Sequence, residues 1–183
     1  MHTHPLAKYV ERIERNDWQG VGELMLSSAV KLAKAGADFL ICPDNTIHQA
    51  MPYVEPRSPL PWLHIAKVVT DAASGFRHVG LTGTRWLVES DVYPREYVRP
   101  TREEREEIHR IIFEELTLGI FKPEAVAYFQ GVIGRLKDQG CDAVVLGCTE
   151  IPLIMNDRNS PLPTLDSTRL LARAALRKAQ STV

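Results

Sequence analysis

A short apolar run that ends at a cysteine constrains this chain more than any other feature. Val144, Val145 and Leu146 are three consecutive aliphatic residues, as expected of a strand covered on both faces of a parallel sheet. Gly147 then allows another backbone to approach closely. Cys148 follows at the carboxyl end of the strand, where open α/β sheets bind ligands. A thiol there is either a reactive proton carrier or, the commoner case, a buried structural side chain.

Short apolar strands alternate with amphipathic helices along the rest of the chain, which predicts parallel βαβ units and an α/β fold. One inward helical face is expected to include Leu24, Ala29, Val30 and Leu32. We expect helices over residues 6–15, 18–35, 66–73, 101–118, 122–139 and 167–180, and further strands over 37–42, 60–65 and 78–82.

Composition excludes several classes of partner. The chain has 183 residues and a formal net charge of −1, which gives no electrostatic case for nucleic acid or an anionic membrane surface. Its three cysteines are irregularly spaced and form neither a disulfide framework nor a metal site. No signal peptide and no membrane-spanning apolar run is recognisable. We therefore expect a cytoplasmic protein with no metal, no nucleic acid and no membrane partner.

An internal repeat gives Cys148 a partner. Residues 32–41 align with residues 136–145, because a leucine, a glycine and an aspartate coincide at a constant offset of 104 positions. In this register Cys148 falls on Asp44. If the two copies pack about an approximate twofold axis, Asp44 and Cys148 flank one cleft from opposite sides. Inversion at a carbon requires such a pair, since one group removes a proton and the other delivers one to the opposite face.

At this point the motifs resemble the aspartate/glutamate racemase superfamily, the cofactor-independent amino-acid racemases. The stretch 147–153 (GCTEIPL) is similar to that family's second catalytic motif, and Asn45-Thr46 followed by His48 is similar to its first. The stretches 81–85 (LTGTR) and 163–168 (PTLDST) also match, and the resemblance extends from near Met1 to near Ala179.

The resemblance implies an architecture. It predicts two pseudo-symmetric parallel-sheet α/β subdomains, with residues 1–75 plus 166–183 in the first and 76–165 in the second. It further implies an active site in the cleft between them and a homodimer. Two departures are apparent. Asp44 stands where the family usually carries a second cysteine, and no residues here correspond to the family's first strand and glycine-rich turn. The stretch 93–97 is also shorter than in family members.

The implied activity is that of an isomerase that works without PLP or any other cofactor. The expected reaction is racemisation or epimerisation of a small acidic amino acid, aspartate or glutamate, with Cys148 serving one face of the α-carbon and Asp44 the other. Thr84 fits a helix cap equally well, and His48 fits a core or capping histidine. The candidate substrate-binding residues are Asn45, Thr46, Thr84, Thr149, Glu150 and His48.

Two alternatives stay open at the level of sequence. One is a related reaction that needs a single cysteine, either decarboxylation of a malonate-like acid or cis–trans isomerisation of an unsaturated diacid. In that reaction Asp44 would only position the substrate. The other is a protein that kept the fold and binds an amino acid with little catalysis. In every case the expected partner is a small amino acid or dicarboxylic acid.

Overall fold

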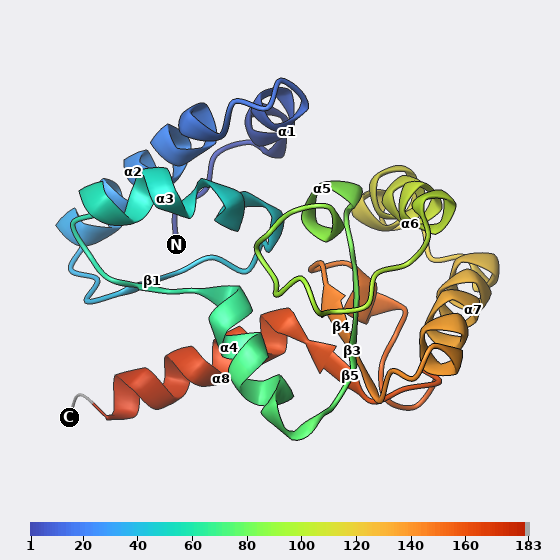
Figure 1. Ribbon diagram of the computed structural model, residues 1–183. Coiled ribbons are helices and arrows are strands. Elements are labelled where there is room, and N and C mark those ends of the chain that lie inside the picture. Colours follow the sequence, from blue (N-terminus) through green and yellow to red (C-terminus); the bar gives the residue numbers. More distant parts are fainter. Residues whose placement is uncertain (182–183) are drawn as a thin grey trace. The chain divides into compact units, whose positions relative to one another are not determined.

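The computed structural model describes residues 1–181 and confirms a mixed α/β fold with two small parallel sheets (Figure 1). The chain divides into two compact units. Unit 1 comprises Met1–Cys42 and Ile47–His64, and unit 2 comprises Pro43–Thr46 and Ile65–Val183. Unit 2 therefore takes a four-residue segment from within the part of the chain that forms unit 1.

The helices and strands have the following bounds. Those of unit 1 are α1 (Leu6–Glu14), α2 (Trp18–Lys34), β1 (Leu40–Ile41), α3 (Met51–Val54) and β2 (Trp62–Leu63). Those of unit 2 are α4 (Ile65–Ala72), β3 (Val79–Gly83), α5 (Arg85–Val88), α6 (Arg102–Glu114), α7 (Pro123–Asp138), β4 (Ala143–Gly147), β5 (Thr164–Asp166) and α8 (Ser167–Gln180). Single 3₁₀ turns lie at Thr46–Ala50, Glu55–Arg57, Ala73–Gly75, Leu116–Leu118 and Ile151–Leu153.

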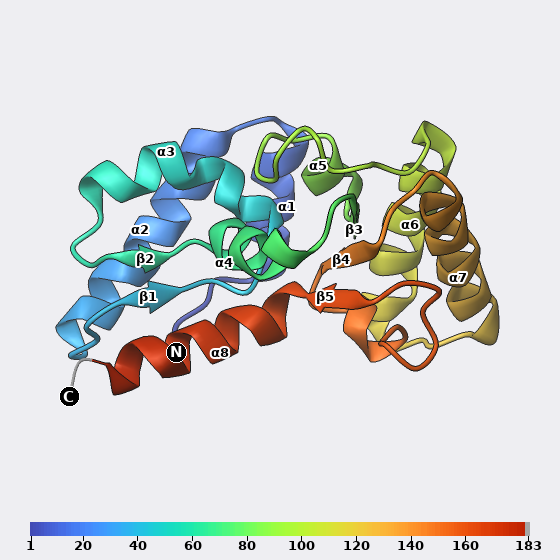
Figure 2. The same cartoon turned by 60° about the horizontal axis from the view of Figure 1, so that its bottom comes forward.

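Unit 1 packs α2 against α1 and α3 beside a two-stranded parallel sheet (Figure 2). The α2 helix begins where the Asp17 carboxylate accepts a hydrogen bond from the Gly20 amide at 2.8 Å, a standard N-terminal cap. Gly22 lets α3 approach, because a Cβ atom there would lie 3.0 Å from the Cβ of Tyr53. These contacts fix the short helix that follows the first strand.

Unit 2 is built on a three-stranded parallel sheet in the order β3-β4-β5. Every residue of β4 is buried, as expected of a central strand. The α6 and α7 helices lie side by side on one side of this sheet, and α4 packs along α8 on the other (Figures 1 and 2). The core between the sheet and the α6–α7 pair includes Ile108, Ile111, Ile112, Phe129, Val132, Ile133, Leu136, Val144 and Leu146.

The two copies of the internal repeat share backbone hydrogen bonds as well as residues. Gly36 and Gly140 both end a helix in the left-handed region, at φ of 87° and 95°. The amide after each glycine returns to the helix in the same register: Ala37 N bonds Leu32 O, and Cys141 N bonds Leu136 O, both at 3.1 Å. This is the same helix-ending motif at the same offset of 104 positions.

The match continues into the strands. The Leu40 amide donates to the Pro61 carbonyl at 2.9 Å, and the Val144 amide donates to the Pro163 carbonyl at 3.0 Å. In each copy the first strand thus begins to pair at a proline that precedes its neighbour. The resemblance of three residues seen in the sequence therefore reflects a repeated helix–strand unit.

Some sequence expectations were wrong in detail. The strands predicted over residues 37–42 and 60–65 pair over only two residues each, Leu40–Ile41 and Trp62–Leu63. Proline explains the short pairing, because Pro43 and Pro61 lie at its limits and have no amide hydrogen to donate. Val30 was predicted to face inward, but its side chain is 43% exposed.

The division predicted at 75/76 and 165/166 stays a prediction. Contacts place residues 65–75 with the three-stranded sheet, because α4 packs along α8. Among residues 1–181, no helix has the length and apolar character needed to cross a bilayer.

Candidate active site

Cys148 follows the carboxyl end of β4, in the middle of the unit 2 sheet. The residue before it, Gly147, lies opposite Gly83 of β3. A Cβ atom on Gly147 would lie 2.6 Å from the carbonyl oxygen of Thr82 and 2.7 Å from a methyl group of Leu87. Only glycine fits at this position. The sequence predicted that another backbone approaches Gly147 closely, and the structure shows that it is the backbone of β3.

The Cys148 thiol donates a hydrogen bond to the Glu150 carboxylate, with Sγ and Oε2 2.9 Å apart. Burial raises the pKa of Cys148 well above its ordinary range, and the charge and hydrogen bond of Glu150 raise it further. A negative charge beside a thiol disfavours the thiolate. Cys148 is therefore a protonated thiol at neutral pH, and Glu150 is the acceptor that orients its proton.

Asp44 belongs to the same unit as Cys148, although it follows β1 in the sequence. Its negative charge contributes to the raised pKa of the Cys148 thiol. The influence of Asp44 is the weakest of those that act on this pKa. Both residues belong to one compact unit, while their placement on opposite sides of a substrate and their roles in a reaction stay predictions.

Asn45 is held by both ends of its side-chain amide. Its Oδ1 accepts a hydrogen bond from the Tyr93 hydroxyl at 2.7 Å, and its Nδ2 donates to Ser167 Oγ at 3.0 Å. The Ser167 hydroxyl in turn donates to the Leu146 carbonyl at 2.8 Å. Asn45 is only 1% exposed. These bonds use only one of the two hydrogens on its amide nitrogen. A role for Asn45 in binding substrate stays a prediction.

Thr46 and Thr84 are buried and joined to each other, with their hydroxyl oxygens 2.8 Å apart. Thr84 also caps α5, because its hydroxyl oxygen accepts a hydrogen bond from the Leu87 amide at 3.1 Å. The Arg85 amide, at the start of this helix, donates to the His109 ring at 3.3 Å. The capping interpretation of Thr84 is confirmed, and its contact with a substrate carboxylate stays a prediction.

The other two predicted binding residues differ in their surroundings. Thr149 follows Cys148 directly and is partly buried in unit 2. His48 lies in unit 1, is 2% exposed, and packs its ring edge-on against the ring of His64 at 4.6 Å between centroids. This burial fits the core histidine that the sequence left open.

Sequence reasoning missed the side chains that hold Asn45. Ser167 was quoted only as part of a motif, and its spacing from Asn45 carries no signal. Tyr93 lies in an irregular, proline-containing stretch that offers no periodicity to predict burial, yet only 1% of it is exposed. Its segment runs beside β3, where the amide of Leu81 donates to the carbonyl of Val98 at 2.9 Å. The burial of Tyr93 thus depends on contacts distant in sequence.

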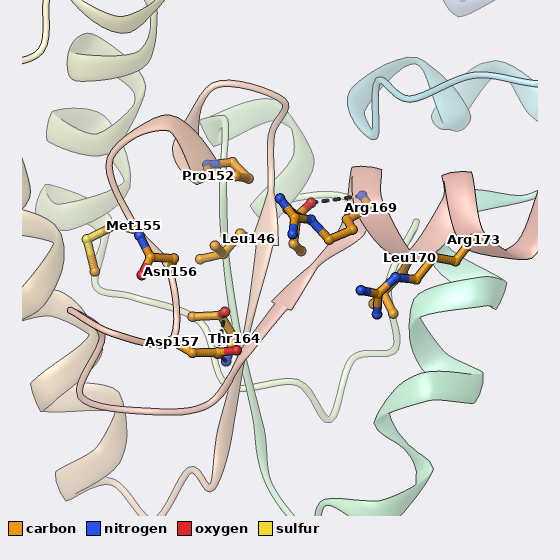
Figure 3. A pocket seen from close by; sticks show the side chains of 10 residues that line it. Leu146, Pro152, Met155, Asn156, Asp157, Thr164, Arg169, Leu170 and Arg173 are labelled. Carbon is orange, nitrogen blue, oxygen red and sulfur yellow. Dashed lines mark hydrogen bonds and ion pairs between the residues drawn. The ribbon is translucent and has the colours of Figure 1, made fainter.

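A hollow of about 220 Å³ lies elsewhere in unit 2, between α8 and the loop before β5 (Figure 3). Two arginines of α8, Arg169 and Arg173, line it together with Asp157 and Asp166. The formal charges cancel, Arg169 forms an ion pair with Asp166 at 3.6 Å, and Asp157 accepts a hydrogen bond from Thr164. Cys148 and Asp44 do not line this hollow.

The described part of the chain, residues 1–181, contains no group of three or more His, Cys, Asp or Glu side chains arranged to hold a metal ion. The polar side chains of the candidate site described above are hydroxyls, one amide and two carboxylates. Such a set can orient an amino acid and move protons.

Comparison with known proteins agrees with this chemistry. The family model described as "Asp/Glu/Hydantoin racemase" matches residues 1–175. The broad specificity amino-acid racemase RacX of Bacillus subtilis is 23% identical over 182 residues, which cover 96% of this chain and 79% of that protein.

Solved structures agree as well. A protein of Yersinia pestis, described as a candidate Asp/Glu racemase, is 32% identical with a TM-score of 0.86, over 97% of this chain and 81% of that one. An aspartate racemase homologue from Pyrococcus horikoshii is 29% identical with a TM-score of 0.77, over 90% of this chain and 76% of that one. Because the family model matches nearly the whole chain and the fold agrees with that of these structures, the chain belongs to the Asp/Glu/hydantoin racemase family.

Proposed function

We propose that this protein racemises or epimerises a small acidic amino acid, without PLP, by proton transfer between Asp44, the α-carbon and Cys148. The observation that carries the proposal is a protonated thiol at the carboxyl end of β4, with Asp44 at the matching position of the repeat in the same compact unit. One group can take a proton while the other delivers one. Family membership supports the reaction class, and the relatives differ in the amino acids that their names mention.

The protonation state of Cys148 determines which residue of the pair accepts the α-proton in the resting enzyme and which residue donates a proton. A carboxylate is ordinarily ionised at neutral pH, with a pKa of ~3.9 for aspartate. The resting pair is then an Asp44 carboxylate that accepts the α-proton and a Cys148 thiol that donates to the opposite face. The reverse turnover begins from the opposite pair, a protonated Asp44 and a Cys148 thiolate.

Glu150 is a poor base for making that thiolate in advance. The pKa of Cys148 is raised well above its ordinary range by burial and by the charge of Glu150, so removal of its proton before the substrate binds is unfavourable. We therefore assign Glu150 the task of orienting the thiol proton.

The carbanion formed between the two groups needs hydrogen bonds to the substrate carboxylate. Asn45, Thr46, Thr84 and Thr149 are the proposed donors, together with nearby backbone amides. Of these, Thr149 is the most accessible, since the other three are at most 5% exposed. His48 is kept as a proposed substrate contact of lower rank because its ring packs against His64. A homodimer and a reducing cytoplasmic setting also stay proposals.

The decisive measurement is exchange of the α-hydrogen in deuterated water, with L- and D-aspartate and L- and D-glutamate as substrates. We expect deuterium at the α-carbon together with loss of optical activity. Cys148→Ala should slow the loss of optical activity by about 10²–10⁴-fold, since it removes one proton carrier. Asp44 can still exchange the α-hydrogen of the enantiomer that it serves. Cys42→Ala is the matched control, because it removes a thiol from unit 1, and it should keep the wild-type rate.

The result that contradicts the proposal is equally clear. Loss of optical activity that persists at the wild-type rate in Cys148→Ala would exclude proton transfer by this thiol. Release of carbon dioxide from a malonate-like acid, with no exchange into amino acids, would indicate the decarboxylase. Binding of an amino acid with neither exchange nor release would indicate a binding protein.

A further inference from the structure

The four groups from Tyr93 to Leu146 form one hydrogen-bond chain whose direction is fixed at its end. A carbonyl oxygen can only accept, so the Ser167 hydroxyl must donate its single proton to Leu146. Ser167 Oγ then accepts from the Asn45 amide nitrogen, which turns the amide oxygen toward Tyr93. The Tyr93 hydroxyl must donate to that oxygen. Every donor in the chain therefore has one assigned acceptor.

This chain is buried throughout and joins the two sides of the candidate site. Tyr93 and Asn45 are each 1% exposed, and Ser167 is fully buried. Asn45 is the residue after Asp44, and Leu146 lies two residues before Cys148. The chain thus ties the backbone beside one proton carrier to the strand end beside the other. All of these residues belong to unit 2.

The segment that carries Tyr93 is held by the side chain of Arg99. The Arg99 guanidinium donates to the carbonyls of Val88 at 2.8 Å and Tyr97 at 2.8 Å, and it reaches the Tyr93 carbonyl at 3.4 Å. Val98, next to Arg99, pairs with β3. Tyr93 is therefore anchored to the sheet, and its hydroxyl is a fixed point from which Asn45 can be positioned.

We propose that Tyr93 and Ser167 are positioning residues, which set the separation of Asp44 and Cys148 by fixing the side-chain amide of Asn45, the residue that follows Asp44. The inference rests on the proposed proton transfer and adds two residues to it. Neither side chain exchanges a proton with the substrate. Their effect is geometric, and geometry matters because a displacement of about 1 Å in a reacting group can slow an enzyme about 10²-fold.

The structure supplies a matched pair of tyrosines for the test. Tyr97 lies beside Tyr93, with ring centroids 5.9 Å apart, and it is also buried. Its hydroxyl has no hydrogen-bond partner within the part of the chain that the structure describes. Tyr93→Phe and Tyr97→Phe therefore remove the same atom from the same cluster, but only the first variant breaks the chain.

The measurement is steady-state kinetics of racemisation by the full-length variants, with thermal melting to establish that each is folded at the assay temperature. In Tyr93→Phe and in Ser167→Ala we expect kcat to fall about 10- to 100-fold, with KM changed by less than about threefold, because the substrate still binds while the proton carriers are displaced. Tyr97→Phe should match the wild type in both constants.

A double variant tests whether the two residues act through one amide. Combining Tyr93→Phe with Ser167→Ala should lower kcat no further than the more severe single change, within about twofold, since either change alone already frees Asn45. Multiplied effects would mean that the residues act independently and would overturn the proposal.

The outcomes separate this inference from the proposed function. A wild-type protein with no exchange would refute the racemase itself. An active wild type with Tyr93→Phe equal to Tyr97→Phe in kcat would refute the positioning role alone. If Tyr93→Phe and Ser167→Ala both unfold while Tyr97→Phe stays folded, the chain serves stability only, and the proposal is likewise overturned.

Discussion

Single side chains decide the protonation of the site before any substrate arrives. Cys148 lies against the Glu150 carboxylate and near Asp44, so two negative charges oppose its ionisation. Reactive cysteines usually have the opposite surroundings, with positive charge that favours the thiolate. A thiol in this environment is suited to donating a proton, and it is correspondingly protected from alkylation and oxidation at neutral pH.

The reactivity of Cys148 should therefore change in a definite direction when Glu150 is neutralised. The negative charge of Glu150 raises the pKa of the thiol, so Glu150→Gln lowers that pKa, and the midpoint of alkylation by iodoacetamide moves to lower pH. Mass spectrometry of the peptide that contains Cys148 measures this apart from Cys42 and Cys141. Asp44→Asn should shift the midpoint the same way by a smaller amount. A midpoint that stays or rises in Glu150→Gln would contradict the assigned contact.

How far the sequence predicts the site depends on the residue. Gly147 and Cys148 could be placed because a buried strand ends there, and Asp44 because it occupies the same position in the repeat. Tyr93 could not be placed, since its burial results from the guanidinium of Arg99 and from pairing of Val98 with β3. Neither contact leaves a local pattern in the sequence.

At the scale of elements, two glycines of α7 should have opposite effects on the free energy of unfolding when they are replaced by alanine. Gly140 ends α7 at a φ of 95°, a conformation that costs a residue with a side chain about 1–2 kcal/mol. Gly134 lies inside the same helix, and a Cβ atom there would meet nothing within 4 Å. The backbone conformation of Gly140 thus disfavours a side chain, whereas the position of Gly134 in the helix can accept one.

Substitution of each by alanine should separate these cases. Gly140→Ala should lower the free energy of unfolding by about 1–2 kcal/mol because of the left-handed backbone. Gly134→Ala should raise it by up to about 1 kcal/mol, since alanine loses less entropy in a helix. Urea unfolding followed by circular dichroism measures both. Equal effects of the two substitutions would mean that the helix end is not held in this conformation.

The elements also show why strands were harder to bound than helices. The helices over 18–34 and 123–138 agree with prediction because each has a glycine at its end and a periodic apolar face. The strands β1 and β2 were predicted too long, because an apolar run does not reveal where prolines stop the pairing. Pairing partners lie far apart in sequence, whereas helix signals are local.

At the scale of the whole molecule, the unequal pair Asp44 and Cys148 predicts unequal turnover of the two enantiomers. L and D forms have the same free energy in water, so kcat/KM must be equal in the two directions. If the two enantiomers differ in kcat, their KM values must therefore differ by the same factor. We expect the enantiomer that requires the less populated protonation state to show the higher KM and, in proportion, the higher kcat.

Asp44→Cys provides the comparison for this prediction. It installs the second thiol that the family resemblance leads one to expect, so the two sides become chemically alike. Progress curves from each pure enantiomer should show kcat and KM values drawing closer together in this variant. Wild-type curves that are already identical from both enantiomers would contradict the assignment of unlike proton carriers.

The bond between Asn45 and Ser167 joins residues 122 positions apart in the chain. A contact of such long range closes only after the intervening chain has been ordered, and closing it is entropically costly. During synthesis the early part of the site must therefore wait for the last helix to emerge. Until then Asn45 has no serine to bind, and its side-chain amide is not yet held in place.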